Sequence, residues 1–326
     1  MSTVLISGGA GFIGSHLCDA YLALGWNVVA IDDLSTGQMA NLAGAQGSQN
    51  FRFVQGDVAD KALVERAMEG CEVVVHLAAR IGLKLVIESP LKTLAANVRG
   101  TEVVLECATA RKLLTVVTST SEVYGLTTKF PSSESDPISF GSPEIGRWSY
   151  ACSKAYDEAL ALASHRESGL PAIVVRLFNT VGPRQSTRYG MVLPRFVRQA
   201  LAGEPLTVYG DGHQTRCFGH VHDAVDGILK LTRNPEAIGK VFNLGNPQEI
   251  RILELANKVL RQTGSEAPIE CVAFDVAYGS GFEEIMRRVP DISRIRSIAG
   301  FEPSRSIDDI VRDVVAYQRT QAVTAP

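Results

Sequence analysis

The sequence lacks several features that would place it in other classes of protein. It has no apolar run of the roughly 18 residues that a membrane-spanning helix needs, and its first residues lack the charged head and apolar stretch of a signal peptide. It also lacks an excess of one charge, because 32 Lys and Arg face 35 Asp and Glu for a net charge of −3. Without a broad basic field, neither nucleic acid nor an anionic membrane is an expected partner.

The cysteines show no pattern of a metal site or of disulfides. They are Cys18, Cys71, Cys107, Cys152, Cys217 and Cys271. No two form a Cys-x-x-Cys pair, and none has metal-like spacing with histidine. A chain of 326 residues can build its core without cross-links. We therefore expect no metal ion, reduced cysteines and a cytoplasmic protein.

What the chain does have is a regular alternation of two apolar patterns within an ordinary globular composition of 45% hydrophobic and 21% charged residues. Short β-branched segments predict strands at 4–6, 28–31, 51–54, 73–77, 115–117 and 173–175. Segments with helical periodicity lie between them, at 13–24, 60–68, 91–110 and 149–167. This alternation predicts an α/β fold with a Rossmann-type doubly wound parallel sheet.

The alternation breaks after Thr180, where Pro and Gly become frequent. Helices are expected near 223–231 and 252–262, and one return to the sheet is expected at 241–244. We therefore expect residues 1–180 to form the sheet domain, with a return at about 214–250. Residues 181–326 should mainly form a smaller mixed α/β lobe.

A glycine-rich turn follows the first expected strand and opens the first expected helix. Gly8, Gly11 and Gly14 have G-x-x-G-x-x-G spacing, which lets the backbone approach a pyrophosphate at the helix N-terminus. Asp32 ends the second strand, where a carboxylate can bind the ribose hydroxyls of a dinucleotide. Asp33 follows Asp32 and no Arg comes directly after them, so the two carboxylates would repel the 2′-phosphate of NADP. NAD is therefore favoured over NADP. Asp57 and Val58 either approach the adenine or begin a helix, with Asp57 as its N-cap.

Tyr150 and Lys154 form a second candidate constellation. Residues four apart on a helix share a face, so the Lys154 ammonium can lie beside the Tyr150 phenol. A nearby cation favours the phenolate, which would make Tyr150 a general base. The alternative is a partly buried pair on an amphipathic helix.

The end of the fifth expected strand carries hydroxyls and a carboxylate, at Thr120, Ser121 and Glu122. Carboxyl ends of parallel strands face the ligand crevice, so these groups can meet the reacting part of a substrate. Alternatively, the hydroxyls cap the next helix.

Together with His76-Leu-Ala-Ala79, these motifs resemble the extended short-chain dehydrogenase/reductases that act on nucleotide sugars as epimerases, dehydratases and decarboxylases. The resemblance continues through Phe178–Arg184, Leu206–Arg216, His220–Asp223 and Asn243–Asn246. It implies an NAD-binding domain, a nucleotide-sugar-binding lobe and a UDP-sugar substrate. The further cofactor contacts that we expect are Phe12, Ile13, Ser35, Thr36, Gly37, Leu77, Ala78, Ala79 and Asn97, besides Tyr150 and Lys154. Expected substrate contacts are Asn179, Arg184, Val192, Thr207, Arg216 and Arg288.

Glu122 and Arg288 separate subgroups of this family. A carboxylate after the hydroxyl pair is similar to UDP-glucuronic acid decarboxylases and 4,6-dehydratases, whereas simple 4-epimerases usually carry an apolar residue there. Arg288, two residues before Pro290, resembles the decarboxylase arginine that reaches the sugar. Arg147-Trp148 resembles the decarboxylase domain of aminoarabinose lipid modification. Gly82–Val86 differs from the usual decarboxylase segment.

The resemblance implies C4 oxidation of a UDP-sugar, with UDP-glucuronate decarboxylation to UDP-xylose as the leading hypothesis. The alternatives are a UDP-sugar 4-epimerase, then a nucleotide-sugar 4,6-dehydratase, and last a catalytically silent NAD-binding module. Helices at 91–110 and 149–167 resemble the family's dimer interface, so a homodimer is expected.

Overall fold

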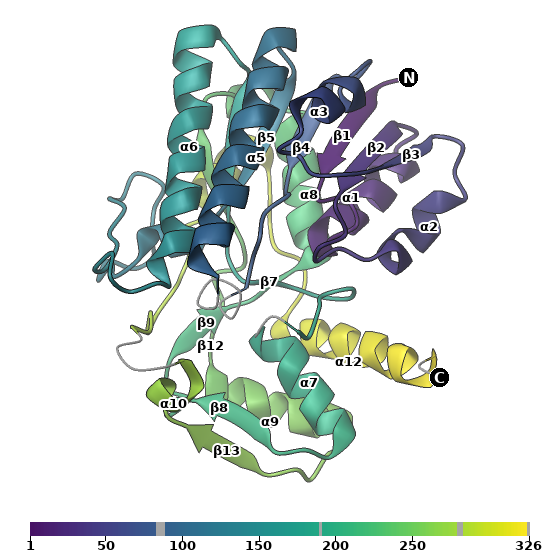
Figure 1. Ribbon diagram of the computed structural model, residues 1–326. Helices are drawn as coiled ribbons and strands as arrows, with labels where there is room; N and C mark the ends of the chain where they lie inside the picture. The colour runs from purple at the N-terminus through teal and green to yellow at the C-terminus, as the bar shows by residue number, and fades with distance from the viewer. Residues whose placement is uncertain (83–88, 189–190, 279–282, 325–326) are drawn as a thin grey trace.

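The computed structural model describes residues 1–82, 89–188, 191–278 and 283–324. Its centre is a seven-stranded parallel sheet in the order β11-β6-β5-β4-β1-β2-β3 (Figure 1). The strands are β1 (Thr3–Ser7), β2 (Asn27–Asp32), β3 (Phe51–Gln55), β4 (Val73–His76), β5 (Leu114–Thr120), β6 (Ala172–Leu177) and β11 (Val241–Leu244). Each strand expected from the sequence is present, and the expected return at 241–244 supplies the edge strand beside β6.

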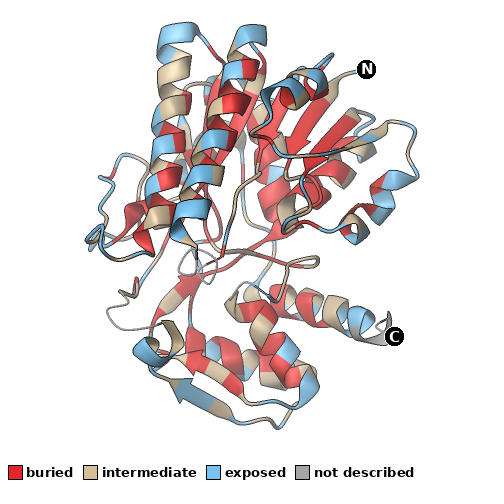
Figure 2. Ribbon diagram, in the orientation of Figure 1, coloured by how far each residue is buried: buried red, intermediate tan, exposed pale blue. Residues whose placement is uncertain are grey.

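Helices cover both faces of this sheet. One face carries α1 (Phe12–Ala23), α2 (Ala43–Gln46), α8 (Val221–Thr232) and α11 (Ser293–Ala299), and the other α3 (Lys61–Ala67), α5 (Pro90–Arg111) and α6 (Trp148–Ser168). Ile6 and Val75 pack into the first layer, whereas Leu5 and Val74 pack into the second. Burial on both faces explains why these strands are continuous apolar runs rather than alternating ones. Figure 2 shows the buried strands between helices whose outer faces are exposed.

A smaller lobe lies below the carboxyl ends of the strands in Figure 1. Its core is formed by α7 (Val192–Ala202), α9 (Ile252–Thr263), α12 (Ile307–Thr324) and the parallel pair β8 (Leu206–Tyr209) and β13 (Ile269–Val272). The pairs β7 (Thr180–Val181) with β10 (Gly219–His220), and β9 (Thr215–Cys217) with β12 (Glu249–Arg251), connect it to the sheet. The remaining elements of the described ranges are short: η1 (Met39–Leu42), η2 (Ser121–Tyr124), η3 (Pro235–Ala237) and α10 (Phe274–Tyr278).

Candidate active site

A cavity of about 470 Å³ lies between the sheet and the smaller lobe. It opens at the carboxyl ends of β1 and β4, which are neighbours in the sheet. From β1 the chain continues to β2 and β3 on one side of β1, whereas β4, β5 and β6 follow on its other side. This reversal of strand order is where doubly wound sheets form their ligand crevice. The expected cofactor residues line it, with the exception of Gly37.

The glycine-rich turn needs its glycines for steric reasons. Gly8 adopts a φ of +70°, which favours glycine, and a Cβ on Gly14 would lie 2.1 Å from the Gly8 carbonyl oxygen. Asp32 is buried beside this turn and accepts hydrogen bonds from the amides of Ala10 (3.0 Å) and Leu34 (2.8 Å). Burial raises the pKa of Asp32. The glycine-rich turn lets a bound group approach the backbone closely, and together with the adjacent Asp32 carboxylate it fits an NAD molecule.

Two expected cofactor residues take more specific positions. Gly37 packs against Asp32, where a Cβ would lie 2.7 Å from the Asp32 Oδ1, and it does not line the cavity. Asp57 lines the cavity and accepts a hydrogen bond from the Ala59 amide, whereas the N-cap of α3 is Asp60, which accepts from the Leu63 amide. The helix-capping role considered for Asp57 therefore belongs to Asp60.

Tyr150 and Lys154 are buried on α6 and both line the cavity. Burial raises the pKa of Tyr150, and the charges of Glu122 and Asp157 raise it further. The Lys154 ammonium donates a hydrogen bond to the Asp157 Oδ2 at 3.0 Å. The sequence pattern places Lys154 beside the phenol but does not reveal this acidic partner.

Thr120 ends β5 and has two roles. Its hydroxyl accepts a hydrogen bond from the Glu122 amide, so it caps η2. It also hydrogen-bonds Tyr150, which opposes the rise in the pKa of that phenol. Thr120 therefore caps the short helix and contacts the candidate base at the same time.

Glu122 belongs to a cluster of three arginines and two carboxylates at the cavity wall. The Arg288 Nη1 lies 3.4 Å from the Glu122 Oε1 and 3.5 Å from the Ser121 hydroxyl. Arg147 lies 3.9 Å from Glu122 and 3.7 Å from Glu284, and Arg216 binds Glu284 at 2.7 Å. Burial and the charge of Arg288 lower the pKa of Arg216 to about 10. The sequence singled out neither Glu284 nor Arg147 as a site residue.

The segment that carries Arg288 is attached to the sheet domain. The Ser132 amide donates to the Val289 carbonyl at 2.8 Å, and the Asp291 amide donates to the Ser132 carbonyl at 2.9 Å. The Asn243 side chain, on β11, donates to the Asp291 carbonyl at 3.0 Å. Arg288 therefore reaches the cavity from a segment fixed against both β11 and the loop before α6.

The other expected substrate residues are divided. Asn179, Arg184 and Val192 line the cavity, and Arg184 forms an ion pair with Asp19 at 2.7 Å. Thr207 does not line it, because its side chain hydrogen-bonds Gln199. The sequence did not single out an aromatic group on the smaller lobe, in which the Arg195 guanidinium lies 4.0 Å from the Tyr209 ring centre and Tyr278 packs edge-on at 5.1 Å.

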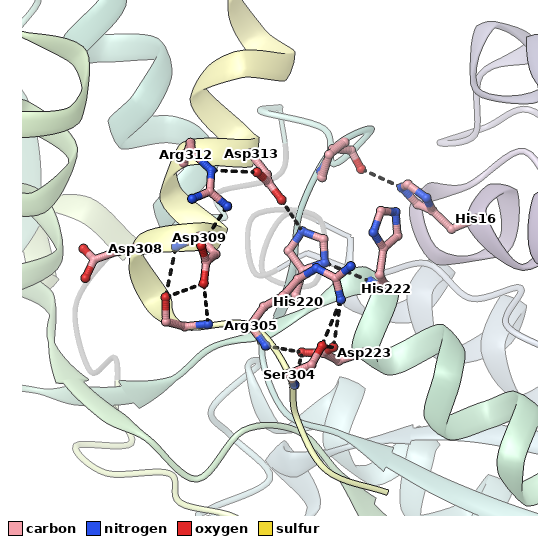
Figure 3. A network of polar contacts seen from close by, with 12 residues as sticks. His16, His220, His222, Asp223, Ser304, Arg305, Asp308, Asp309, Arg312 and Asp313 are labelled. Carbon is pink, nitrogen blue, oxygen red and sulfur yellow. Dashed lines mark hydrogen bonds and ion pairs between the residues drawn. The ribbon is translucent and has the colours of Figure 1, made fainter.

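A histidine network joins α1, α8 and α12 beside the cavity (Figure 3). His16 hydrogen-bonds the Pro183 carbonyl at 3.0 Å, which holds the turn bearing Arg184 against α1. The His222 ring lies between those of His16 and His220, at 5.1 and 4.8 Å. Asp223 accepts hydrogen bonds from Ser304 and Arg305 near the start of α12. These contacts tie the two parts of the molecule together.

Buried neutral histidines predict acid-sensitive stability. Burial lowers the pKa of His16 and of His220 to about 4, and burial with the charge of Lys154 lowers that of His76 to about 3. Unfolding restores the ordinary pKa of 6.5, so the unfolded chain binds more protons between these values. We expect the free energy of unfolding to fall as the pH drops below 6.5, by up to about 1.4 kcal/mol per pH unit for each histidine.

Urea unfolding between pH 7 and 4.5 measures this slope. His16→Gln keeps a side-chain donor but removes the titration, so its slope should be about 1.4 kcal/mol per pH unit shallower. His213→Gln, at an exposed position, is the matched control and should keep the parental slope. Equal slopes for the His16 variant and the parent would contradict the expectation.

In the described ranges, no group of three or more His, Cys, Asp or Glu side chains could hold a metal ion. Over the same ranges, no helix is long and apolar enough to cross a membrane. The divergent segment at 82–86 lies outside the described residues from position 83 onward.

The fold and the cavity define a Rossmann-type α/β protein with a dinucleotide site and a second, charged site beside it. Residues 4–245 match the model of the NAD dependent epimerase/dehydratase family. The chain therefore belongs to this family, whose members depend on NAD.

The similar proteins include decarboxylases and an epimerase. The chain is 37% identical to UDP-N-acetyl-alpha-D-glucosaminuronate decarboxylase of Bacillus cytotoxicus over 316 residues, covering 97% of each chain. It is 37% identical to UDP-glucuronic acid decarboxylase 4 of Arabidopsis thaliana over 305 residues, which are 92% of this chain but 65% of that longer one. The crystal structure of the Bacillus cereus UDP-glucuronic acid 4-epimerase, with UDP-glucuronic acid and NAD, superposes with a TM-score of 0.88 at 27% identity, covering 98% of this chain and 99% of that one.

Proposed function

We propose that this chain is an NAD-dependent decarboxylase of a UDP-hexuronate, with UDP-glucuronate as the first candidate and UDP-xylose as its product. The observation that carries the proposal is the pair of Glu122 and Arg288 on the cavity wall. Counted with Arg147, Arg216 and Glu284, the cluster has three cations and two anions. The Arg288 Nε is buried and has no hydrogen-bond partner among the described residues, so it can still donate to a ligand. An anionic sugar carboxylate suits such a site.

The cofactor would lie along the glycine-rich turn, with Asp32 at its ribose and Tyr150 and Lys154 at its reactive end. Bound NAD supplies an acceptor for two electrons and one hydrogen from C4 of the sugar, and returns them at the end. Tyr150 takes the proton of the C4 hydroxyl, with Thr120 and Lys154 supporting the phenol. C4 then becomes a ketone β to the C5 carboxylate.

Decarboxylation follows from this ketone. The C5–C6 bond breaks, its electron pair moves into the C4 carbonyl as an enolate, and carbon dioxide leaves. Glu122 and Arg288 would orient the carboxylate and deliver the proton that C5 takes up. We assign Asn179, Arg184, Val192 and Arg216 to the nucleotide sugar, and Thr207 to the shell behind it. We further propose that residues 1–180, with a return at about 214–250, bind NAD and that 181–326 mainly bind the sugar nucleotide.

Product mass tests the proposed function. The purified protein is incubated with NAD and, separately, with UDP-glucuronate, UDP-N-acetylglucosaminuronate, UDP-glucose and UDP-galactose. A product lighter by the mass of carbon dioxide, formed from a uronate alone, is the expected result. The neutral sugars should remain unchanged. A uronate product of unchanged mass would overturn decarboxylation.

A 4-epimerase is the second candidate, because the Bacillus cereus relative with the same fold holds UDP-glucuronic acid. In this reaction the ketone rotates in the site and hydrogen returns to the other face of C4. The same incubation separates the two candidates, since epimerisation leaves the mass unchanged and gives a chromatographically distinct isomer.

We also propose a cytoplasmic homodimer. The helices α5 and α6 pack together and carry exposed apolar and aromatic side chains, with Leu91 on α5 78% exposed and Tyr156 on α6 42% exposed. Light scattering should give about 70 kDa, twice the 35.1 kDa of one chain. Tyr156→Arg should shift the mass toward one chain, whereas Leu24→Arg, at an exposed position after α1, should not. A parental mass near 35 kDa would remove the dimer.

A further inference from the structure

The Lys154 ammonium has an acidic neighbour that none of the family motifs includes. Lys154 and Asp157 lie three residues apart on α6, and their side chains are 2% and 0% exposed. The Nζ–Oδ2 hydrogen bond of 3.0 Å is the only one that Nζ makes to a described residue. A carboxylate buried to this degree is costly unless a partner compensates it. Lys154 therefore supplies the compensation that the buried Asp157 carboxylate needs.

A chain of buried hydrogen bonds runs from Ser7 through His76 to Thr101, which lies near Asp157. The Ser7 hydroxyl accepts from the amides of Leu77 and Ala78, so its proton goes to the His76 Nδ1 at 2.7 Å. His76 is neutral, and its Nε2 then donates to the Thr101 hydroxyl at 3.1 Å.

Thr101 in turn donates to the Asn97 carbonyl. Burial raises the pKa of the Asp157 carboxyl, and the Lys154 ammonium and the nearby Thr101 hydroxyl oppose this rise. The Asp157 Oδ1 has no hydrogen-bond partner among the described residues. The carboxylate is thus held on one side by Lys154 and reaches no other cation that the structure describes.

The charged groups around Tyr150 come from several elements. Glu122 lies on η2 and Asp157 on α6, and both act on the phenol. Arg147, at the start of α6, and Arg288 are engaged with Glu122. On β4, His76 is neutral, and on α5, Asn97 and Thr101 carry no charge. Of the two carboxylates that raise the Tyr150 pKa, Glu122 is engaged by arginines, whereas Asp157 is paired with Lys154.

We propose that Asp157 is a positioning residue that holds the Lys154 ammonium in place and cancels part of its charge at Tyr150. This rests on the proposed function only in taking Tyr150 as the base. Removing the Asp157 charge removes an anion near the phenol and leaves the ammonium uncompensated. Both changes favour the phenolate. Asp157 thus keeps Tyr150 protonated to higher pH than a motif of Tyr150 and Lys154 alone would.

The test is a spectroscopic titration that needs no sugar substrate. Tyrosinate absorbance of the NAD-loaded protein is followed with pH, and the same titration of Tyr150→Phe is subtracted to isolate the Tyr150 signal. In Asp157→Asn, measured against its own Tyr150→Phe double variant, we expect the Tyr150 midpoint to fall by about one pH unit. Asp157→Glu keeps the charge and should return the midpoint to the parental value.

Glu158→Gln is the matched control. Glu158 is the next residue on α6 and equally buried, but it pairs with Arg176 at 2.7 Å. This variant should lower Tm as a broken buried pair does and leave the Tyr150 midpoint unchanged. If Asp157→Asn does not fold, Asp157→Ser, which leaves room for water beside the ammonium, takes its place.

The proposal is overturned if the Tyr150 titration midpoint in Asp157→Asn stays at the parental value or rises, even if the Tm of that variant falls. So does an Asp157→Glu variant that behaves like Asp157→Asn. Failure of the decarboxylase proposal would appear in product masses and leave this titration intact.

Discussion

Replacing Tyr150 with Phe is expected to reduce kcat by about 10²- to 10⁴-fold, the range that general acid–base catalysis contributes. The phenol is the buried group on the cavity wall that hydrogen-bonds Thr120 and shares its helix face with Lys154. Phe keeps the ring and its packing but removes the proton carrier. NAD affinity, measured by calorimetry, should therefore stay near the parental value while turnover of the uronate is lost.

Tyr124→Phe is the matched control for this experiment. Tyr124 is also buried, and its hydroxyl donates to Asn243 at 2.7 Å, but it does not line the cavity. This variant should lose stability by about 1 kcal/mol, the contribution of one hydrogen bond, and keep its turnover. Parental turnover in Tyr150→Phe would show that another group removes the C4 proton.

Glu122→Gln should separate the chemical steps. The amide keeps the size of the side chain but loses the charge that Arg288 faces at 3.4 Å. We expect release of carbon dioxide to slow by about 10²- to 10⁴-fold, whereas C4 oxidation needs only Tyr150 and its supports. Stopped-flow absorbance should then show reduced cofactor accumulating in the first turnover, and mass spectrometry should show little product.

Glu283→Gln controls for the loss of an acidic group nearby. Glu283 accepts a hydrogen bond from the Trp148 indole at 2.9 Å and does not line the cavity. It should decarboxylate the uronate at close to the parental rate. Unchanged decarboxylation in Glu122→Gln would exclude Glu122 from the step at C5. If the chain were a simple 4-epimerase, the same substitution should leave the rate of epimerisation near the parental value.

The central strands of the sheet could be predicted because local pattern and buried position agree in them, whereas the edge strand β3 is only partly buried and shows in the sequence through its apolar residues alone. Val73–His76 and Ile173–Val175 are apolar on both sides, and they are buried on both sides. Much of the smaller lobe could not be predicted, because its segments are short and interrupted by proline, as in α7, which contains Pro194 in its first turn. The C-terminal helix α12, which runs to Thr324, is likewise not among the helices expected from the sequence.

The site residues divide in the same way. Gly14 and Tyr150 belong to local spacings that carry their own chemistry, so their positions follow from the motif. Glu284 acquires its role only from contact with Arg216, 68 residues away, and Asp157 only from the burial of Lys154. An ionisable residue on a helix has no sequence signal that distinguishes a solvated position from a buried partner.

The attachment of the Arg288 segment has a consequence for protein engineering. The arginine that faces Glu122 is anchored to Ser132 and Asn243 on the sheet side of the molecule, although it lies in the second half of the chain. The residues just before it are bonded to β9 and β12 as well, since the Met286 carbonyl accepts from the Thr215 amide at 2.9 Å and Arg287 pairs with Glu249 at 2.6 Å. A substitution on either of these strands can therefore shift Arg288 relative to Glu122, so that variants made to change which substrate is bound should also be assayed for which reaction they carry out.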